Sequence, residues 1–322
     1  MAPLRIVTLA PFTDRLRDNL SLDAELIAVP TEGGDEMAEA IRDADVLVNG
    51  VFRSEWAGTA PNLRLVHAMG AGYDGIVLDA VPPGCQVANV YGHDYGIAEY
   101  AFMVMAALNR DLFRVDRDLR EGRWTGGLQR ELRGRSVLIV GLGHIGREVA
   151  RWARFVGMRV SAVTDHPSEE RRQTSNLRAL GSLEDIAAFA READFVVVAV
   201  PHAESTRDLI DERVLAGMRP TAYLVNVGRG PVIDQWALFR ALRDNRIAGA
   251  AIDVWYHYPE GDGPQLPSDA PFHELSNVIL TPHMSGYTEG TMRYRYAAIA
   301  ENIRRLVDNE PLDNVVWPRV QA

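Results

Sequence analysis

The sequence has little of what marks secreted, membrane or nucleic-acid-binding proteins. Cys85 is the only cysteine among 322 residues, which excludes an internal disulfide and favours a reducing compartment. The 34 Lys and Arg are outnumbered by 44 Asp and Glu, giving a net charge of −10 without any basic tract, so nucleic acid and anionic membranes are poor partners. The longest apolar run, residues 101–108, is too short to cross a bilayer, and no secretory leader pattern is present. We therefore expect a cytoplasmic protein with no nucleic-acid or membrane partner.

Metal-binding patterns are also missing from the sequence. Its eight histidines are not paired with cysteines or carboxylates at ligand spacing. The acidic, proline-rich stretch 259–269 lacks the ligand spacing of an EF-hand. We therefore expect neither a structural nor a catalytic metal.

Short β-type runs alternate with amphipathic helical patterns along the chain, which is typical of parallel α/β layers. The expected strands fall in two series, at residues 4–9, 26–29, 46–49, 63–68 and 87–90, and then from Val137 through 159–163, 195–200, 222–227, 250–254 and 278–280. Helical patterns at 96–110 and 288–307 connect the two series. We therefore expect two doubly wound parallel-sheet domains, with residues 99–287 inserted between 1–98 and 288–322.

The start of the second series carries the most specific local motif, SVLIVGLGHIGREVA at residues 136–150. Gly141 allows a tight turn after the strand, Gly143 lets the backbone approach a pyrophosphate, and Gly146 lets the following helix pack closely on its strand. His144 and Ile145 open that helix, whose N-terminus favours an anion. The pattern predicts a dinucleotide site, although a tight strand-to-helix turn alone would also account for it.

A second strand, residues 159–163, returns where a βαβ unit of about thirty residues should. Thr164 and Asp165 follow it, and a carboxylate there accepts from the adenosine ribose hydroxyls and repels a 2′-phosphate. We therefore expect NAD(H) in preference to NADP(H). Arg171 and Arg172 lie close enough in the sequence to keep NADP(H) open.

Three later segments place reactive side chains at the ends of strands, where open α/β sheets bind ligands. Arg229 stands between two glycines and can bind a carboxylate through two parallel hydrogen bonds. Asp253 ends an apolar strand and can accept from a nicotinamide carboxamide. His283 follows a strand, and histidine exchanges protons near neutrality. Each has a plain alternative, respectively a surface cation, a cap and a structural histidine.

Taken together and in this order, these residues resemble the D-isomer-specific 2-hydroxyacid dehydrogenase family. The resemblance runs from the loop at residues 69–74, through the Ala98-Glu99 pair, to the turn around His283. It implies a Rossmann cofactor domain inserted into a flavodoxin-like substrate domain, and a homodimer formed through the cofactor domains with residues 112–132 as an interface arm.

The resemblance also implies the reaction, which is hydride transfer between NAD(P)H and the carbonyl carbon of a 2-oxoacid. Arg229 would bind the substrate carboxylate, the backbone N–H groups of Ala71 and Gly72 would hold its other oxygen, and His283 would be the general acid and base, worth on the order of 10² to 10⁴ in rate. The cofactor-binding residues would be Gly141, Gly143, His144, Ile145, Gly146, Thr164, Asp165, Pro201, Thr206, Val227, Asp253 and Gly286.

One residue departs from the family pattern. Tyr258 occupies the place of a glutamate that normally hydrogen-bonds the catalytic histidine and favours its protonated form. A phenol can orient the ring but supplies no negative charge, so we expect reduction to fade at lower pH than in relatives with the glutamate. The alternative that Glu260 folds back onto His283 stays open.

Three other functions fit the same architecture. Formate dehydrogenases pair a glutamine with the histidine and carry an asparagine where His93 aligns, and phosphite dehydrogenase carries a lysine where Ala71 aligns. Neither pattern is present here. Carboxy-terminal binding protein corepressors keep the arginine and histidine, so an NAD(H)-sensing interaction protein remains an alternative that a test for turnover would separate.

Overall fold

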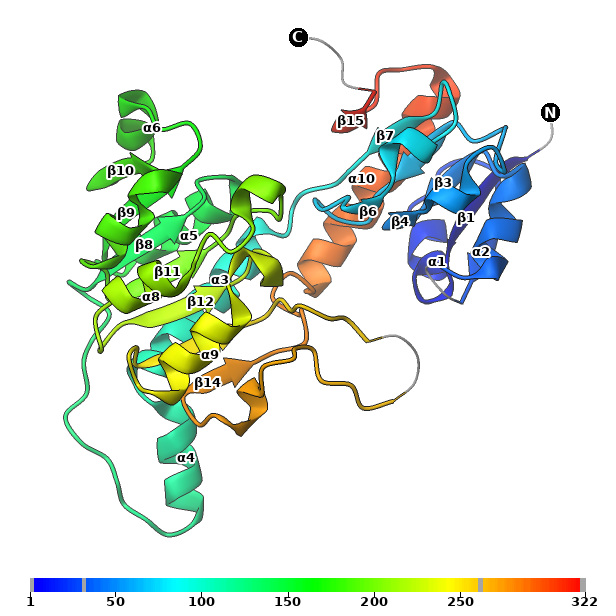
Figure 1. The fold of residues 1–322 in the computed structure, drawn as a ribbon. Coiled ribbons are helices and arrows are strands. Elements are labelled where there is room, and N and C mark those ends of the chain that lie inside the picture. Colours follow the sequence, from blue (N-terminus) through cyan, green and yellow to red (C-terminus); the bar gives the residue numbers. More distant parts are fainter. Residues whose placement is uncertain (1–2, 31–32, 260–262, 319–322) are drawn as a thin grey trace. The chain divides into compact units, whose positions relative to one another are not determined.

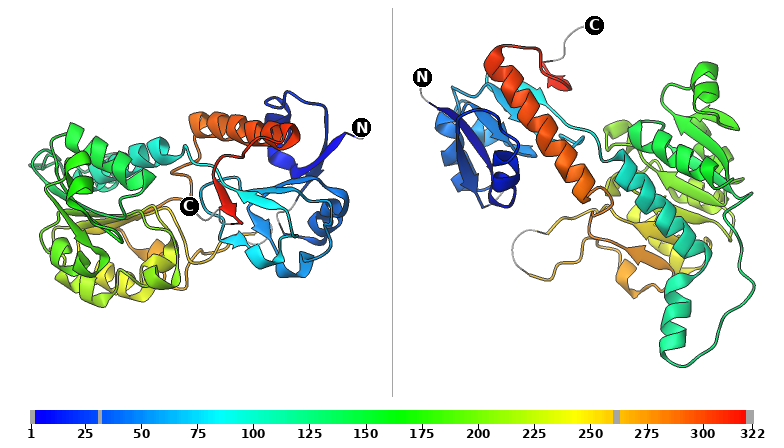
Figure 2. Two further views of the ribbon diagram at one scale, coloured as in Figure 1. Left: turned by 90° about the horizontal axis from the view of Figure 1, so that it is seen from above. Right: turned by 180° about the vertical axis from the view of Figure 1, so that it is seen from behind.

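The computed structural model describes residues 3–30, 33–259 and 263–318, and the chain divides into two compact units. Unit 1 comprises Met1–Gly92 and Glu289–Ala322, and unit 2 comprises His93–Thr288 (Figures 1 and 2). The sequence-based domain boundaries lie a few residues from these breaks. The first break precedes residue 98 because the whole of α3 (Asp94–Asn109) packs on α5 (His144–Phe155) and on strand β12 (Tyr223–Asn226) within unit 2.

Unit 1 is built on a six-stranded sheet in the order β15-β7-β5-β3-β1-β2. All neighbours are parallel except β15, which runs antiparallel to β7. This is the flavodoxin-like strand order with one added edge strand. The strands are β1 (Leu4–Leu9), β2 (Ala24–Val29), β3 (Val46–Val48), β5 (Leu65–His67), β7 (Gln86–Ala88) and β15 (Val315–Trp317), with a separate pair β4 (Val51–Phe52) and β6 (Gly75–Ile76).

A continuous apolar run in β3 explains why this sheet is covered on both faces. Val46 and Val48 point into one core cluster and Leu47 into the other, as the two-residue period of a strand requires. The first cluster contains Ile299 and Ile303 of α10 (Glu289–Asp308). The other helices of unit 1 are α1 (Ala10–Arg17) and α2 (Asp35–Ala40).

Unit 2 has a seven-stranded, entirely parallel sheet in the order β10-β9-β8-β11-β12-β13-β14. Its first six strands follow the Rossmann order, so the expected pair of doubly wound domains is confirmed. The strands are β8 (Ser136–Val140), β9 (Arg159–Thr164), β10 (Ala179–Ser182), β11 (Phe195–Val198), β12, β13 (Gly249–Ile252) and β14 (Val278–Leu280).

Helices cover both faces of the unit 2 sheet. Val137 and Ile139 of β8 pack with residues of α3 and α5, whereas Leu138 and Val140 pack with residues of α7 (Ile186–Ala190), α8 (Glu212–Gly217) and α9 (Gln235–Arg243). Two further helices are α4 (Leu112–Arg120) and α6 (Glu169–Thr174). Short 3₁₀ turns lie at Ile41–Asp43, Ser54–Trp56, Leu78–Ala80, Leu183–Asp185, Glu204–Thr206, Gly230–Val232 and Phe272–Glu274.

Strands β10 and β15 are absent from the sequence-based expectation. The ALGS segment of β10 has no β-branched residue, and it is held by pairing to β9 rather than by its own propensity. Strand β15 is three residues long and pairs with β7 from far along the chain. In the part of the chain that the structure describes, no helix is long and apolar enough to span a membrane. Across residues 3–30, 33–259 and 263–318, no group of three or more His, Cys, Asp or Glu side chains is arranged to hold a metal ion.

Candidate active site

The glycine turn between β8 and α5 is tightly packed at two of its glycines and open at the third. Gly141 has φ +98°, and a Cβ there would lie 2.6 Å from Val200 Cγ1. A Cβ on Gly146 would lie 1.9 Å from the Gly141 carbonyl oxygen, so this helix can pack on its strand only with glycine. A Cβ on Gly143 would meet no atom within 4 Å, and no side chain caps α5 there. The turn therefore leaves space and an uncapped helix N-terminus for an anion.

The end of β9 carries two opposing signals for the adenosine end of a dinucleotide. The Thr164 hydroxyl is buried and donates to Asp165 Oδ1 at 3.0 Å, while the Asp165 side chain is 68% exposed. Arg171 donates from one guanidinium nitrogen to the His166 carbonyl at 2.7 Å and from the other to the Leu142 carbonyl at 3.2 Å. A carboxylate and a guanidinium thus both lie at this end of the glycine turn.

The loop after β11 is locked by its own threonine. Thr206 is buried, and its Oγ1 donates to the Pro201 carbonyl at 2.8 Å while accepting from Ala203 N–H at 2.8 Å. Pro201 itself is exposed beside this lock. The segment has the fixed shape that a cofactor-lining loop needs.

Arg229 sits on a loop whose two glycines are dictated by close backbone approach. A Cβ on Gly228 would lie 2.5 Å from the Val200 carbonyl oxygen, and a Cβ on Gly230 would lie 2.3 Å from the Trp255 carbonyl oxygen. The Asn226 side chain accepts from Gly228 N–H and donates to the Arg229 carbonyl, both at 3.1 Å. The backbone of Arg229 is therefore fixed between the loops that follow β11 and β13.

Asp253, directly after β13, organises the turn that carries His283. It is fully buried, and its carboxylate accepts from Thr281 Oγ1 at 2.6 Å, Met284 N–H at 2.9 Å and Ser285 N–H at 2.9 Å. A carboxylate offers about four acceptor positions, so this grip leaves room for one further donor. The carboxamide contact expected for Asp253 stays a prediction.

Two aromatic residues form further hydrogen bonds to Thr281, just before His283. The Trp255 indole donates to the Thr281 carbonyl at 2.8 Å, and Tyr100 of α3 lies 2.6 Å from Thr281 Oγ1. Because Thr281 gives its only hydroxyl hydrogen to the Asp253 carboxylate, the Tyr100 hydroxyl must donate to Thr281. Burial raises the pKa of Tyr100 to about 12, so the phenol keeps its proton. Tyr100, Thr281 and Asp253 thus form one directed chain of hydrogen bonds.

His283 occupies a strained, exposed position on the turn held by this chain. Its backbone φ is +53°, in the left-handed region that residues other than glycine rarely adopt. The Tyr258 ring lies 5.4 Å from the imidazole between centroids, tilted by 48°. Burial raises the pKa of Tyr258 even though Arg229 opposes this rise electrostatically, so the phenol stays neutral. Glu260 lies outside the described residues.

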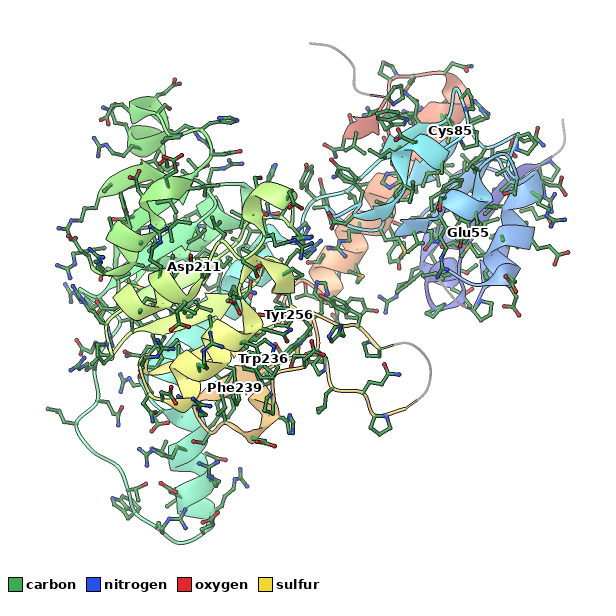
Figure 3. All side chains as sticks on the ribbon, in the orientation of Figure 1. Glu55, Cys85, Asp211, Trp236, Phe239 and Tyr256 are labelled. Carbon is green, nitrogen blue, oxygen red and sulfur yellow. The ribbon has the colours of Figure 1, made fainter. Side chains whose placement is uncertain are left out.

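The segment that carries Tyr258 is anchored just before it. Tyr256, labelled in Figure 3, donates from its hydroxyl to the Ile233 carbonyl at 2.9 Å, and burial raises its pKa strongly.

Cys85, also labelled in Figure 3, is buried in unit 1, and burial raises the pKa of its thiol to about 12, so it is an unreactive core residue.

The topology of unit 2 brings these predicted residues to one edge of its sheet. Strands β12, β13 and β14 are adjacent and parallel, and Arg229, Asp253 and His283 follow their respective carboxyl ends. Ala71 and Gly72 belong to unit 1, on the loop after β5, where Asn89 donates to the Ala71 carbonyl at 2.8 Å. The edge of unit 2 therefore combines a guanidinium, a neutral phenol and an imidazole.

Comparison with known proteins identifies the family of this chain. The family model described as "D-isomer specific 2-hydroxyacid dehydrogenase, NAD binding domain" matches residues 102–285. The chain belongs to this family. Its members' names and the matched cofactor domain make this dehydrogenase an NAD(P)-dependent oxidoreductase.

Relatives of this 2-hydroxyacid dehydrogenase cover nearly its full length. It is 34% identical over 289 residues to the glyoxylate reductase of Korarchaeum cryptofilum, covering 86% of this chain and 84% of that protein. The structure is similar to D-mandelate dehydrogenase of Rhodotorula graminis, with a TM-score of 0.84, 26% identity and coverage of 100% and 99% of the two chains. It is also similar to the NADPH-dependent glyoxylate/hydroxypyruvate reductase of Sinorhizobium meliloti, solved with NADP and malonate, with a TM-score of 0.82, 26% identity and complete coverage of both chains.

Some contributors to the dehydrogenase site escape analysis of the sequence. Tyr100 and Thr281 are 181 positions apart, and Trp255 lies within a strand-end segment without any motif of its own. The only sequence feature that points to Thr281 is its position two residues before the candidate histidine. No spacing pattern predicts that Thr281 forms a hydrogen bond with a tyrosine of α3.

Proposed function

We propose that this dehydrogenase is a 2-oxoacid reductase, with Arg229 binding the substrate carboxylate and His283 exchanging the proton at the substrate oxygen. The observation that carries the proposal is the placement of both side chains after adjacent parallel strands, with Asp253 between them holding the histidine turn. The name of the Korarchaeum relative favours a small substrate such as glyoxylate.

Each residue has a defined task in this mechanism. Arg229 neutralises the carboxylate and polarises the adjacent carbonyl through its guanidinium hydrogen bonds. His283 donates a proton to the carbonyl oxygen during reduction and takes it back during oxidation. Tyr258, as a neutral phenol 5.4 Å from the imidazole between ring centroids, limits the orientation of the ring without adding charge. Ala71 and Gly72 offer backbone N–H groups to a carboxylate from unit 1.

The residues of unit 2 fit a nicotinamide dinucleotide, which would supply the hydride when bound. The support is the open space at Gly143, the uncapped N-terminus of α5 and the locked loop at Pro201. His144, Ile145, Val227 and Gly286 complete the proposed cofactor set. We favour NAD(H), because the exposed Asp165 carboxylate repels a 2′-phosphate and Arg171 is already engaged by two backbone carbonyls.

A screen of 2-oxoacids with NADH and NADPH in parallel tests the activity and the cofactor preference together. We expect steady NADH consumption with at least one of glyoxylate, pyruvate, hydroxypyruvate or a larger oxoacid. A His283→Asn variant should bind NADH normally and lose roughly 10² to 10⁴ in rate. Tight NADH binding without turnover on any substrate would overturn the proposal in favour of a sensor. Higher efficiency with NADPH would reverse the cofactor preference.

A homodimer is also part of the proposal. Helix α4 and the segment after it expose large apolar side chains, Phe113 at 60%, Trp124 at 89% and Leu128 fully, which a partner copy would cover. Light scattering at micromolar concentration should give twice the chain mass, and a monomer would contradict this. The cytoplasmic location stays a prediction from the sequence.

A further inference from the structure

Arg295, in the first part of α10 in unit 1, is a partly buried cation without a counter-charge. Among the described residues it makes no hydrogen bond or ion pair, and its Nε is buried without a partner. Burial lowers the pKa of its guanidinium. Arg304 and Arg305 of the same helix show the ordinary behaviour, since each pairs with Glu301 and with other carboxylates. Removing a charge from water without pairing it destabilises a fold.

The position of this guanidinium is fixed by the packing of α10 on two loops. Its Nη2 lies 3.6 Å from where a Cβ of Gly70 would stand, which is an ordinary van der Waals distance, so the guanidinium lies beside the loop after β5. The neighbouring Tyr294 ring packs against Gly92, where a Cβ would lie 2.2 Å from the ring. Gly92 has φ +89°, so no other residue fits that contact well.

The loop beside Arg295 presents unused donors. The Gly70 carbonyl accepts from Val90 N–H at 3.2 Å, and the Ala71 carbonyl accepts from the Asn89 side chain at 2.8 Å. Both carbonyls are thus engaged by the segment after β7. Within the described part of the chain, the N–H groups of Ala71 and Gly72 meet no protein acceptor. These two amide donors and the Arg295 guanidinium therefore all belong to unit 1, with the guanidinium beside the neighbouring Gly70.

We propose that Arg295 adds its guanidinium to a subsite at the loop of Ala71 and Gly72, whose backbone N–H groups the family resemblance already assigns to a substrate carboxylate, and that Arg295 is a specificity-determining residue of this dehydrogenase. A planar carboxylate accepts from a guanidinium and from backbone N–H groups together, and its negative charge offsets the cost of burying the cation. The subsite rests on the proposed function for its substrate, a 2-oxoacid. The carboxylate it takes is either the one next to the reacting carbonyl or a second acid group at the far end of a dicarboxylic oxoacid.

If Arg295 binds a carboxylate, its replacement should weaken carboxylate binding without lowering the stability of the ligand-free protein. Replacing Arg295 by methionine removes an unpaired charge and keeps most of the side-chain length, so the ligand-free variant should melt at the same or a higher temperature than wild type. The same change should weaken carboxylate binding by about tenfold or more. An arginine that only supports the fold would lower the melting temperature when removed.

The experiment compares wild type with Arg295→Met, Arg295→Lys and the control Arg293→Met, an exposed arginine of the same helix. Thermal shift with malonate measures anion binding without turnover. Steady-state kinetics then compare glyoxylate and pyruvate with oxaloacetate and 2-oxoglutarate. We expect Arg295→Met to lose most of the malonate stabilisation and to raise KM with little change in kcat, Arg295→Lys to recover part of both, and Arg293→Met to behave as wild type.

The substrate comparison separates the two sources of the carboxylate. A KM increase for all four oxoacids assigns the subsite to the reacting carboxylate, and an increase for the dicarboxylic pair alone assigns it to the second acid group. Unchanged malonate stabilisation and unchanged KM in Arg295→Met would overturn the proposal, as would loss of folding in both Arg295 variants. Should wild type reduce no oxoacid, the proposed function fails, and the malonate arm still decides whether Arg295 binds a carboxylate.

Discussion

Lowering the pH from 7 to 5 should weaken the fold of unit 1 through one imidazole, that of His67 in β5. The side chain is fully buried, with Nδ1 2.9 Å from the Ala68 carbonyl oxygen and Nε2 3.0 Å from Asn302 Nδ2. Asn302 uses its oxygen to accept from Asp313 N–H at 2.8 Å, so its amide nitrogen faces His67. Nε2 must therefore accept, Nδ1 must donate, and the folded protein holds the ring neutral.

The magnitude follows from the difference in proton affinity between the folded and unfolded chain. Burial lowers the pKa of His67 from 6.5 to about 4. Between these values the unfolded chain binds a proton that the folded chain does not, so the free energy of unfolding falls as the pH falls through 6.5. At pH 5 this linkage removes about 2 kcal/mol relative to pH 7, and the loss levels off below about pH 4 at roughly 3 kcal/mol.

Urea unfolding followed by circular dichroism, at pH steps between 7 and 5, measures this effect. A His67→Gln variant should be less stable at pH 7, because it disturbs a buried hydrogen-bonded site, but its stability should depend less on pH by about 2 kcal/mol over this range. His166→Gln, at an 86% exposed side chain, is the matched control and should keep the wild-type slope. Equal pH slopes for wild type and His67→Gln would refute the reasoning.

Four further substitutions test the site and the glycine turn. Replacing Tyr258 by glutamate should move the reductive limb of the pH-rate profile of His283 upward, and an unmoved limb would remove the phenol from the argument. Gly146→Ala should cost about 3 kcal/mol or more of stability, because its Cβ would lie 1.9 Å from a backbone oxygen. Gly143→Ala has open space at its Cβ, so this variant should have the melting temperature of wild type. A titration with NADH should show weaker binding, because the added methyl group lies where the pyrophosphate is proposed to bind. Equal stability of the Gly146→Ala and Gly143→Ala variants would contradict the packing argument. Tyr100→Phe should lower kcat several-fold with KM nearly constant, since it loosens the histidine turn rather than the carboxylate site, and an unchanged kcat would show that the hydroxyl is dispensable.

Local chemistry made much of this molecule predictable. The glycine turn could be interpreted because Gly141 and Gly146 are required by contacts within a few residues of the motif or on the next strand. The strand ends at Arg229 and His283 could be placed because apolar β-type runs stop just before them. The alternation of β-type runs with amphipathic helical patterns likewise predicted two parallel sheets packed between helices.

Other features depend on contacts between distant segments, which one sequence does not encode visibly. The Tyr100 hydroxyl finds Thr281 only after α3 has docked on the sheet. The need for glycine at 230 arises from the Trp255 carbonyl on a neighbouring loop. Arg295 looks like any helical arginine until the structure shows that, among the described residues, its buried Nε has no hydrogen-bond partner. Strand β10 forms by pairing with β9, since its own residues have little β propensity.

The hydrogen bonds that hold the His283 turn all lie within one of the two units. Tyr100, Asp253, Trp255 and the glycine turn all belong to residues 93–288, so the proposed proton donor and the proposed cofactor turn are both built within one folding unit. The loop at Gly70–Gly72 and Arg295 belong to the other. Under the proposed roles of these residues, we expect an exchange of unit 1 between relatives to alter which acids are accepted and to leave the redox chemistry in place.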